Sequence, residues 1–201
     1  DATNYSDQTS IFVKPTTTPA FMPWAAGAVV RIPASKSGSG IKNYLFSHYK
    51  IGGGIISLCE ENGKLVFHYG KETTNFVHWE SSSGAIPFDS WIGIGMTFDG
   101  GDTHHEFASY PQRFRFYTMD LVTGAPTLLT GTFTVDQVGY DSDFASTGTF
   151  NVGAQNNTDA FGGFIASIGF TTVRSNIGHM NSSQLSEFTR DPTEFVTNFK
   201  L

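Results

Sequence analysis

The densest group of polar side chains that could bind a ligand lies between residues 102 and 110. Asp102, His104, His105 and Glu106 follow one another closely, and Tyr110 comes just after them. Neutral imidazoles and carboxylates coordinate divalent ions, so this stretch predicts a loop that binds a ligand or a metal. His104 and His105 would point to opposite sides of an extended strand, which favours the alternative interpretation of a solvated hairpin tip.

A second acidic group, Asp141 and Asp143, follows Tyr140 in a turn-like stretch. Carboxylate oxygens suit Ca²⁺, so the two aspartates predict a calcium site, and Tyr140 is counted with the ligand-binding residues. The full ligand spacing of a calcium loop is absent. The alternative is a turn in which the Asp side chains accept hydrogen bonds from the local backbone. Calcium is the only cofactor that the sequence indicates.

Among the three tryptophans, Trp79 has the most polar surroundings, with His78 and Glu80 on either side of it. The flat face of an aromatic ring can stack on the C–H groups of a sugar, while polar neighbours bond the sugar hydroxyls. We therefore predict that Trp79 is a stacking platform and that His78 and Glu80 contact the ligand. His68, with Tyr49 and Tyr69, could line a concave sheet face, and ordinary cross-strand pairing is the alternative.

Composition limits the classes of protein to consider. The chain has 201 residues, and its 12 Lys and Arg give a net charge of −6, which argues against nucleic-acid binding because phosphate contacts need clustered cations. No stretch approaches the roughly 18 apolar residues that span a membrane. The single cysteine, Cys59, excludes an intrachain disulfide and is predicted to be a small buried residue. The 22 Gly and 19 Phe with few charges are typical of a β-sandwich or barrel.

Strand-like segments follow one another along most of the chain. Ile92, Ile94, Met96 and Phe98 alternate with small residues, and this pattern predicts that they share one buried sheet face. The predicted strands are Ala26–Ile32, Tyr44–Tyr49, Gly54–Cys59, Lys64–Tyr69, Trp91–Phe98, Arg113–Met119, Thr127–Val135, Thr149–Ala154 and Phe164–Val173.

Turn and helix signals complete this reading of the chain. Asn62-Gly63 between two strands predicts a tight hairpin, since both residues tolerate a positive φ. In the last strand, Phe164, Ala166, Ile168 and Phe170 are predicted to share a face. The one helical signal, residues 181–188, begins with capping residues, and Pro192 ends it. We expect a single all-β domain over residues 1–201, a two-sheet antiparallel jelly-roll sandwich with one short C-terminal helix, in which residues 1–23 form an edge or docking segment.

Three stretches resemble the laminin G-like, concanavalin A-like lectin domains. They are the hairpin Gly54–Phe67, the strand Asp89–Gly100, and the closing pair Phe150–Gly153 and Phe161–Ile168. The resemblance covers about Phe12 to Arg190 and implies a jelly roll in which Trp91 occupies a core position. Two departures are a longer turn after Phe116–Asp120 and an insertion at residues 101–112. Members of this superfamily include glycan-binding modules, adhesion domains, accessory modules of sugar-active enzymes, and surface parts of viruses and phages.

The catalytic signatures that this resemblance would bring are absent from the sequence. Glucan-cleaving relatives carry three acids at alternate positions of one strand, and Asp141-Ser142-Asp143 lacks the third acid. Alginate-lyase relatives carry a Gln-x-His strand, but Gln112-Arg113 is not followed by a histidine. A Gly-x-Ser-x-Gly nucleophile elbow is also missing, because Ser37–Gly40 lacks the strand–turn–helix context. We therefore predict that the chain is not an enzyme.

The function expected from these observations is a non-catalytic carbohydrate-binding or adhesion module, located outside a cell or on a particle surface. Its partner would be a glycan or polysaccharide, without nucleic acid and without membrane insertion. The first alternative is a structural or decorating surface protein of a virus, phage or other assembly, bound to copies of itself or to an assembly partner. The second alternative is a divergent polysaccharide lyase or glycoside hydrolase.

Overall fold

A computed structural model of the chain describes residues 3–5, 24–49, 55–70, 76–98, 114–136, 149–155 and 160–172. The described elements are β1 (Thr3–Tyr5), β2 (Trp24–Arg31), the short 3₁₀ helix η1 (Ala34–Lys36), β3 (Lys42–Tyr49), β4 (Ile55–Glu61), β5 (Lys64–Gly70), β6 (Phe76–Ser81), β7 (Trp91–Phe98), β8 (Phe114–Met119), β9 (Pro126–Leu128), β10 (Gly131–Asp136), β11 (Thr149–Val152) and β12 (Phe164–Thr172). The region 181–188, where a helix is predicted, lies outside the described residues.

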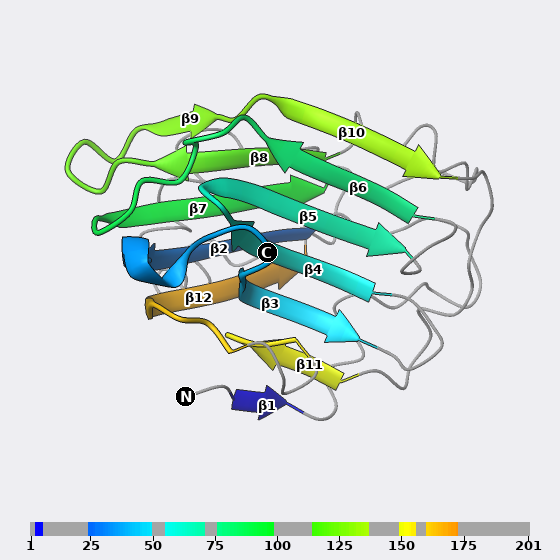
Figure 1. Cartoon of the computed structure of the whole chain (residues 1–201). Coiled ribbons are helices and arrows are strands. Elements are labelled where there is room, and N and C mark those ends of the chain that lie inside the picture. The colour runs from blue at the N-terminus through cyan, green and yellow to red at the C-terminus, as the bar shows by residue number, and fades with distance from the viewer. Residues whose placement is uncertain are drawn as a thin grey trace.

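Two antiparallel sheets form a sandwich, as the sequence predicts (Figure 1). The seven-stranded sheet has the order β1-β11-β3-β4-β5-β6-β10, and the five-stranded sheet has the order β12-β2-β7-β8-β9. β1 pairs with β11 and forms an edge of the larger sheet. Within the described part of the chain, no helix has the length and apolar character needed to cross a membrane.

The core lies between the inner faces of the two sheets. Ile92, Ile94, Met96 and Phe98 of β7 are all buried there, which confirms the alternation predicted for this strand. Cys59 is also buried, as predicted, but it lies in a separate small cluster with Tyr44 and Val66.

The turn between β4 and β5 has the geometry that its sequence predicts. Asn62 and Gly63 have φ values of 52° and 76°, as a two-residue turn that matches the twist of a hairpin requires. The hairpin register then pairs Cys59 with Val66 and Ser57 with His68. The turn therefore fixes which side chains of β4 and β5 lie next to one another.

One predicted strand is in fact two strands that belong to different sheets. The segment expected as Thr127–Val135 divides into β9, which pairs with β8, and β10, which pairs with β6. The backbone N–H of Leu129 still bonds the carbonyl of Phe116 at 2.8 Å, and the chain then crosses to the other sheet. Gly131 opens β10, where a Cβ atom would collide with the Glu80 carbonyl and the Trp79 ring. The close approach of these two strands thus requires glycine.

The predicted face of β12 is wrong for half of the strand. The register with β2 shifts between Ile165 and Ser167. This bulge exchanges the inner and outer faces for the residues that precede it. Ile165 therefore packs against the core together with Ile168 and Phe170. Phe164 is 57% exposed, although alternation alone groups it with Ile168 and Phe170.

Candidate functional site

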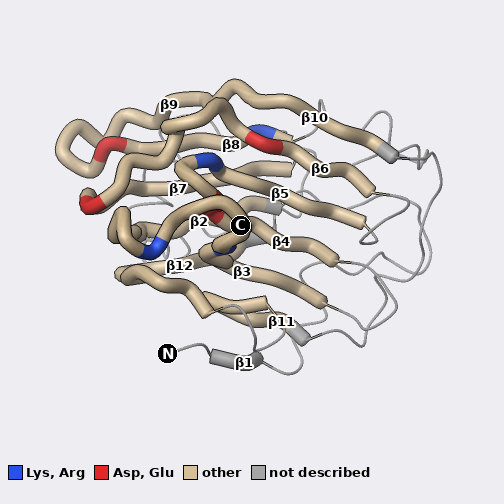
Figure 2. Tube along the Cα trace, in the orientation of Figure 1, with Lys and Arg blue, Asp and Glu red and all other residues tan. Residues whose placement is uncertain are grey.

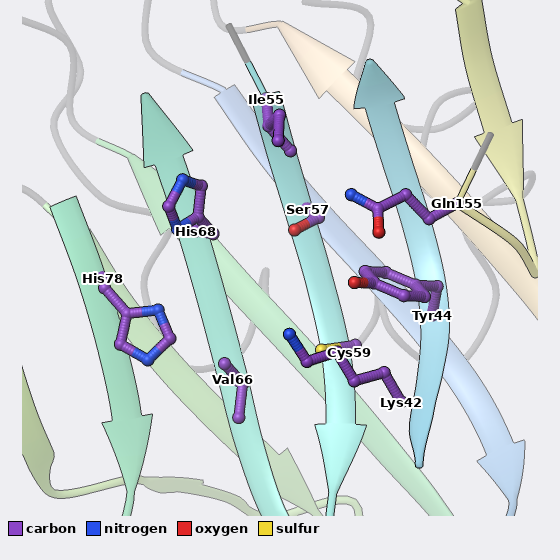
Figure 3. Close-up of a pocket in the computed structure, with 9 residues that line it drawn as sticks. All are labelled: Lys42, Tyr44, Ile55, Ser57, Cys59, Val66, His68, His78 and Gln155. Atoms are coloured by element: carbon purple, nitrogen blue, oxygen red, sulfur yellow. The ribbon is translucent and has the colours of Figure 1, made fainter. Parts of the chain in front are cut away.

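A pocket of about 140 Å³ opens on the outer face of the seven-stranded sheet, on the side away from the core (Figure 3). Its lining comes from four adjacent strands and from the segment that follows β11. The lining residues are Lys42 and Tyr44 of β3, Ile55, Ser57 and Cys59 of β4, Val66 and His68 of β5, His78 of β6, and Gln155. We call it the outer-face pocket. It is smaller than the roughly 300 Å³ of typical drug-sized sites, so it suits one unit of a longer ligand.

Strand register explains why these side chains meet. Tyr44, Cys59 and Val66 lie side by side on β3, β4 and β5, and all three are buried. Because alternate residues of a strand share a face, the residues two positions along form the next row, with Ser57 beside His68 and His68 beside His78.

A bulge in β3 turns the Tyr44 side chain to the outer face of the sheet. The register between β3 and β4 shifts between Tyr44 and Phe46, so that Tyr44 pairs with Cys59 and Phe46 with Leu58. Phe46 consequently packs in the core between the sheets, while Tyr44 belongs to the outer-face cluster. An irregularity of this kind re-aims a side chain without interrupting the sheet.

Two hydrogen bonds to the preceding residues hold Gln155 over the sheet. The chain turns at Gly153, whose φ is 72° and whose N–H bonds the carbonyl of Leu45 at 3.0 Å. The Ser47 hydroxyl then donates to the carbonyl of Ala154 at 2.9 Å. These two contacts place Gln155 beside Tyr44, and the amide of Gln155 points into the pocket (Figure 3).

Contacts of Glu80 with Lys64 and with His78 hold His78 at the rim of the pocket. Glu80 accepts a bond from the Lys64 ammonium at 2.8 Å through one oxygen, and its other oxygen lies 3.1 Å from His78 Nε2. The hydrogen bond from Lys64, followed by that from His78, lowers the pKa of the Glu80 carboxyl. An ionised carboxylate only accepts hydrogen bonds, so His78 Nε2 carries the proton in this contact. When the ring is neutral, its Nδ1 is then an acceptor.

The pocket therefore offers hydrogen-bonding groups from two sides. The Lys42 ammonium, the Tyr44 hydroxyl and the Gln155 amide extend over the strands from one side, and the imidazoles of His68 and His78 stand on the other (Figure 3). The two imidazole centroids are 6.0 Å apart. A ligand in this position would meet donors and acceptors as well as the flat faces of aromatic rings, which is a mixture typical of small-molecule sites.

The sugar-stacking role predicted for Trp79 is wrong. Only 2% of Trp79 is exposed, because the ring lies in the core and stacks on Phe116 of the other sheet with centroids 3.9 Å apart. His78 and Glu80, its neighbours in sequence, point to the opposite face and reach the outer-face pocket or its rim. The polar surroundings that suggested an exposed tryptophan belong to the other side of the sheet.

The core position predicted for Trp91 is also wrong. Trp91 is 45% exposed and lies on the outer face of the five-stranded sheet, with its ring centroid 6.5 Å from that of the exposed Phe164. Arg31 lies between them in the register, paired with both. The resemblance placed Trp91 in the core, although alternation along β7 puts it opposite the buried Ile92.

The two polar loops predicted as binding sites lie outside the described residues. This applies to Asp102, His104, His105, Glu106 and Tyr110 of the first, and to Tyr140, Asp141 and Asp143 of the second. Within the described ranges, no group of three or more His, Cys, Asp or Glu side chains could hold a metal ion. The calcium site remains a prediction.

Sequence reasoning found His78 and named His68 for a sheet face, but it missed Lys42, Tyr44, Ser57 and Gln155 as site residues. Gln155 lies about a hundred residues after β3 in the sequence. The hydrogen bond between Ser47 of β3 and Ala154, which brings Gln155 to the sheet, spans 107 residues. A signal was available for Ser57, because alternation in β4 places it opposite the core-facing Ile56 and Leu58. The bulge in β3 hides the outward position of Tyr44 from the same pattern.

No protein-family model matches the sequence, and no curated protein matches it either. Solved structures do match the fold. The LG1-3 region of the laminin alpha2 chain has 14% identity and a TM-score of 0.51, over 89% of this chain and 32% of that chain. Domain 4 of AbnA, a GH43 extracellular arabinanase from Geobacillus stearothermophilus solved in complex with arabinotriose, has 12% identity and a TM-score of 0.50, over 94% and 87%.

The enzymatically active domain of bacteriophage CBA120 tailspike protein 2 is similar to the same degree, with 12% identity and a TM-score of 0.50, over 95% of this chain and 29% of that chain. This chain thus spans about a third of the length of the laminin region it matches. At such low identity these likenesses define the fold alone. The fold is the laminin G-like, concanavalin A-like jelly roll that the sequence predicts.

Proposed function

We propose that this protein is a non-catalytic, extracellular carbohydrate-binding module whose binding site is the outer-face pocket. The observation that carries the proposal is the lining itself, which places hydroxyl, amide, imidazole and ammonium groups around one small opening. Sugars present many hydroxyl groups that both donate and accept hydrogen bonds, so they need this mixture of partners. A similar fold in domain 4 of the arabinanase, solved with arabinotriose, supports the same choice of ligand class.

The described lining also supports binding rather than hydrolysis. Glycoside hydrolysis uses two carboxyl groups on either side of the scissile bond. Among the described residues that line the pocket, none carries a carboxylate. The nearest acid along the sheet, Glu80, is held by Lys64 and His78 and keeps a lowered pKa, which is the opposite of what a general acid needs.

The test is binding to a broad glycan array by the wild-type protein and by two pocket variants, Gln155→Ala and His78→Ala. Loss of one ligand hydrogen bond should weaken binding about fivefold to tenfold in each variant. Thr127→Ala, an exposed polar residue of β9 on the other sheet, is the control and should bind as wild type does. Repeating the array with a chelator tests the predicted calcium site separately.

Two outcomes would contradict the proposal. Absence of binding to any glycan would overturn the carbohydrate function and favour the alternative of a structural surface protein. Binding that survives both pocket substitutions but is lost in Trp91→Ala would show a glycan site on the five-stranded sheet, and the outer-face pocket would then not be the site.

A second candidate function, cleavage of the bound sugar chain, has one observation in its favour. The pocket sets the His78 imidazole across from the Tyr44 hydroxyl, and both groups can transfer protons. Incubation of wild-type protein with each array ligand that binds, followed by chromatography of the products, tests it. New chain ends that disappear in Tyr44→Phe would establish an enzyme, whereas unchanged ligands support the non-catalytic module.

A further inference from the structure

The charges around the outer-face pocket differ from those of the chain as a whole. The chain carries a net charge of −6, yet among its described lining residues the one full charge is the ammonium of Lys42. Figure 2 shows that charged residues are sparse along the described strands. Lys42 is the charged group that lines the pocket, with Glu61 next to it in the register and Lys64 next to Glu61.

The described acids beside the pocket on this face of the sheet are already engaged. Glu80 bonds Lys64 and His78 through its two oxygens. Glu61, the register partner of Lys42, accepts a hydrogen bond from the backbone N–H of Gly40 at 3.0 Å. These contacts hold both carboxylates in place outside the lining, so that the groups facing a ligand are a cation, two imidazoles and neutral donors.

Resting on the proposed carbohydrate function, we propose that the pocket selects an acidic sugar, namely a uronic acid unit whose carboxylate lies against Lys42. The Lys42 ammonium bends over the floor of the pocket near Cys59, on the side where the Tyr44 hydroxyl and Gln155 amide also point (Figure 3). A carboxylate at this point would accept a charge-assisted bond from the ammonium and further bonds from the neutral donors.

The number of cations favours a uronic acid over a heavily sulfated chain. A polyanion with several charges per repeat is held by clustered Lys and Arg, because each neutralised charge needs its own cation. The described lining has one such cation, which matches a sugar with one negative group per unit. A flat carboxylate on an otherwise neutral ring also leaves the remaining hydroxyls for Ser57, His68 and His78.

The experiment compares uronic acid tetrasaccharides with the same tetrasaccharides after chemical reduction of their carboxylates, by isothermal titration calorimetry. Reduction keeps the sugar stereochemistry and removes only the charge. The galacturonate, glucuronate and mannuronate series are each tested in both forms, together with a sulfated tetrasaccharide. We expect the preferred acidic form to bind at least about tenfold more tightly than its reduced form.

Variants then assign the preference to Lys42. Lys42→Met should bind the acidic and reduced forms about equally, while Lys42→Arg should keep the preference for the acid. Arg115→Met is the matched control, because Arg115 is an exposed cation on the five-stranded sheet and its removal changes the net charge equally. The control variant should retain the wild-type preference.

The outcomes separate this inference from the proposed function. Equal binding of acidic and reduced forms by the wild-type protein would overturn the acidic-sugar inference and leave carbohydrate binding intact. Tighter binding of the sulfated chain, or a preference that Arg115→Met abolishes as well, would also overturn it. If no sugar binds in either form, the proposed function itself fails.

Discussion

Two tryptophans of this chain lie in opposite environments, and each lies on the side opposite to the one predicted for it. Trp79 fills the space between the sheets and stacks on Phe116, whereas Trp91 stands at the surface beside Phe164. The difference has a simple cause, because successive residues of a strand face opposite sides. His78 and Glu80 are polar since they face outward, and for the same reason Trp79 between them faces the core.

The free energy of unfolding should distinguish the two rings. Trp79→Ala removes a buried ring from the centre of the sandwich and should reduce stability by about 3–5 kcal/mol. Trp91→Ala removes a half-exposed ring and should reduce it by less than about 1 kcal/mol. Urea titrations followed by far-ultraviolet circular dichroism measure both values. Similar losses in the two variants would contradict the placement of Trp79 as the core residue.

His48 gives the stability a dependence on pH. Burial lowers the pKa of this histidine below its ordinary value of 6.5, so the folded protein keeps the ring neutral where the unfolded chain would protonate it. The unfolded state therefore binds more protons as the pH falls through 6.5, and stability decreases there. Above that pH neither state is protonated at His48, and its contribution is constant.

Substitution of His48 by Gln should remove this dependence. The free energy of unfolding of the wild type should fall between pH 7.5 and 5.5 more steeply than that of His48→Gln. Urea titrations at intermediate pH values give the two slopes, and the comparison of slopes is unaffected by any constant loss of stability in the variant. Parallel curves would show that His48 is not the group responsible.

At the scale of elements, one buried carboxylate joins four parts of the chain. Glu60 of β4 is fully buried and accepts bonds from the Ser37 hydroxyl at 2.5 Å, from the Gly63 N–H at 2.7 Å and from the Asn43 amide at 2.7 Å. The oxygen of the Asn43 amide in turn accepts from the Gly162 N–H at 2.9 Å. The network links the residues after η1, strand β3, the β4–β5 turn and the approach to β12.

Replacing Glu60 by Gln should destabilise the protein although the shape of the side chain is kept. In either orientation its NH₂ group would face a donor, the Asn43 amide or the Gly63 N–H. An unsatisfied buried donor costs about 1–3 kcal/mol, and this is the expected loss in urea unfolding. Glu61→Gln, at the partly exposed neighbouring position, is the control and should change stability by less than about 0.5 kcal/mol. A loss as small as that in Glu60→Gln would mean that the network does not hold these elements together.

At the scale of the whole molecule, the core is shared by both sheets. Phe67 of the larger sheet lies 4.7 Å from Phe114 and 5.3 Å from Phe116 of the smaller one, centroid to centroid. Trp79 makes a similar contact across the same interface. Neither sheet can therefore bury its apolar face without the other.

Both sheets should consequently unfold in one transition. Tryptophan fluorescence, to which the buried Trp79 contributes, and far-ultraviolet circular dichroism should give the same urea midpoint. The comparison should be repeated in Phe116→Leu, where a lower midpoint should still be shared by the two signals. Separate midpoints would show that one sheet persists after the other has opened. The single domain expected over residues 1–201 would then have to be divided.

Features that depend on neighbours along the chain follow from the sequence alone. The alternation in β7 predicted its buried face, and Asn62-Gly63 predicted the hairpin that sets the register of β4 and β5. Local patterns suffice here because the period of two and the tolerance for positive φ are properties of the strand and the turn themselves.

Tertiary structure decided what depends on partners distant in sequence. The bulge in β12 turned Phe164 outward, the crossing at Gly131 divided one expected strand between two sheets, and the contact of Ser47 with Ala154 set Gln155 over β3. The outer-face pocket exists because the pairing of β3, β4, β5 and β6 brings side chains from all four strands into adjacent rows. Asn62-Gly63 encodes the pairing of β4 with β5, but no local pattern encodes their pairing with β3 and β6. Those pairings are stabilised by the core on the opposite face of the same strands.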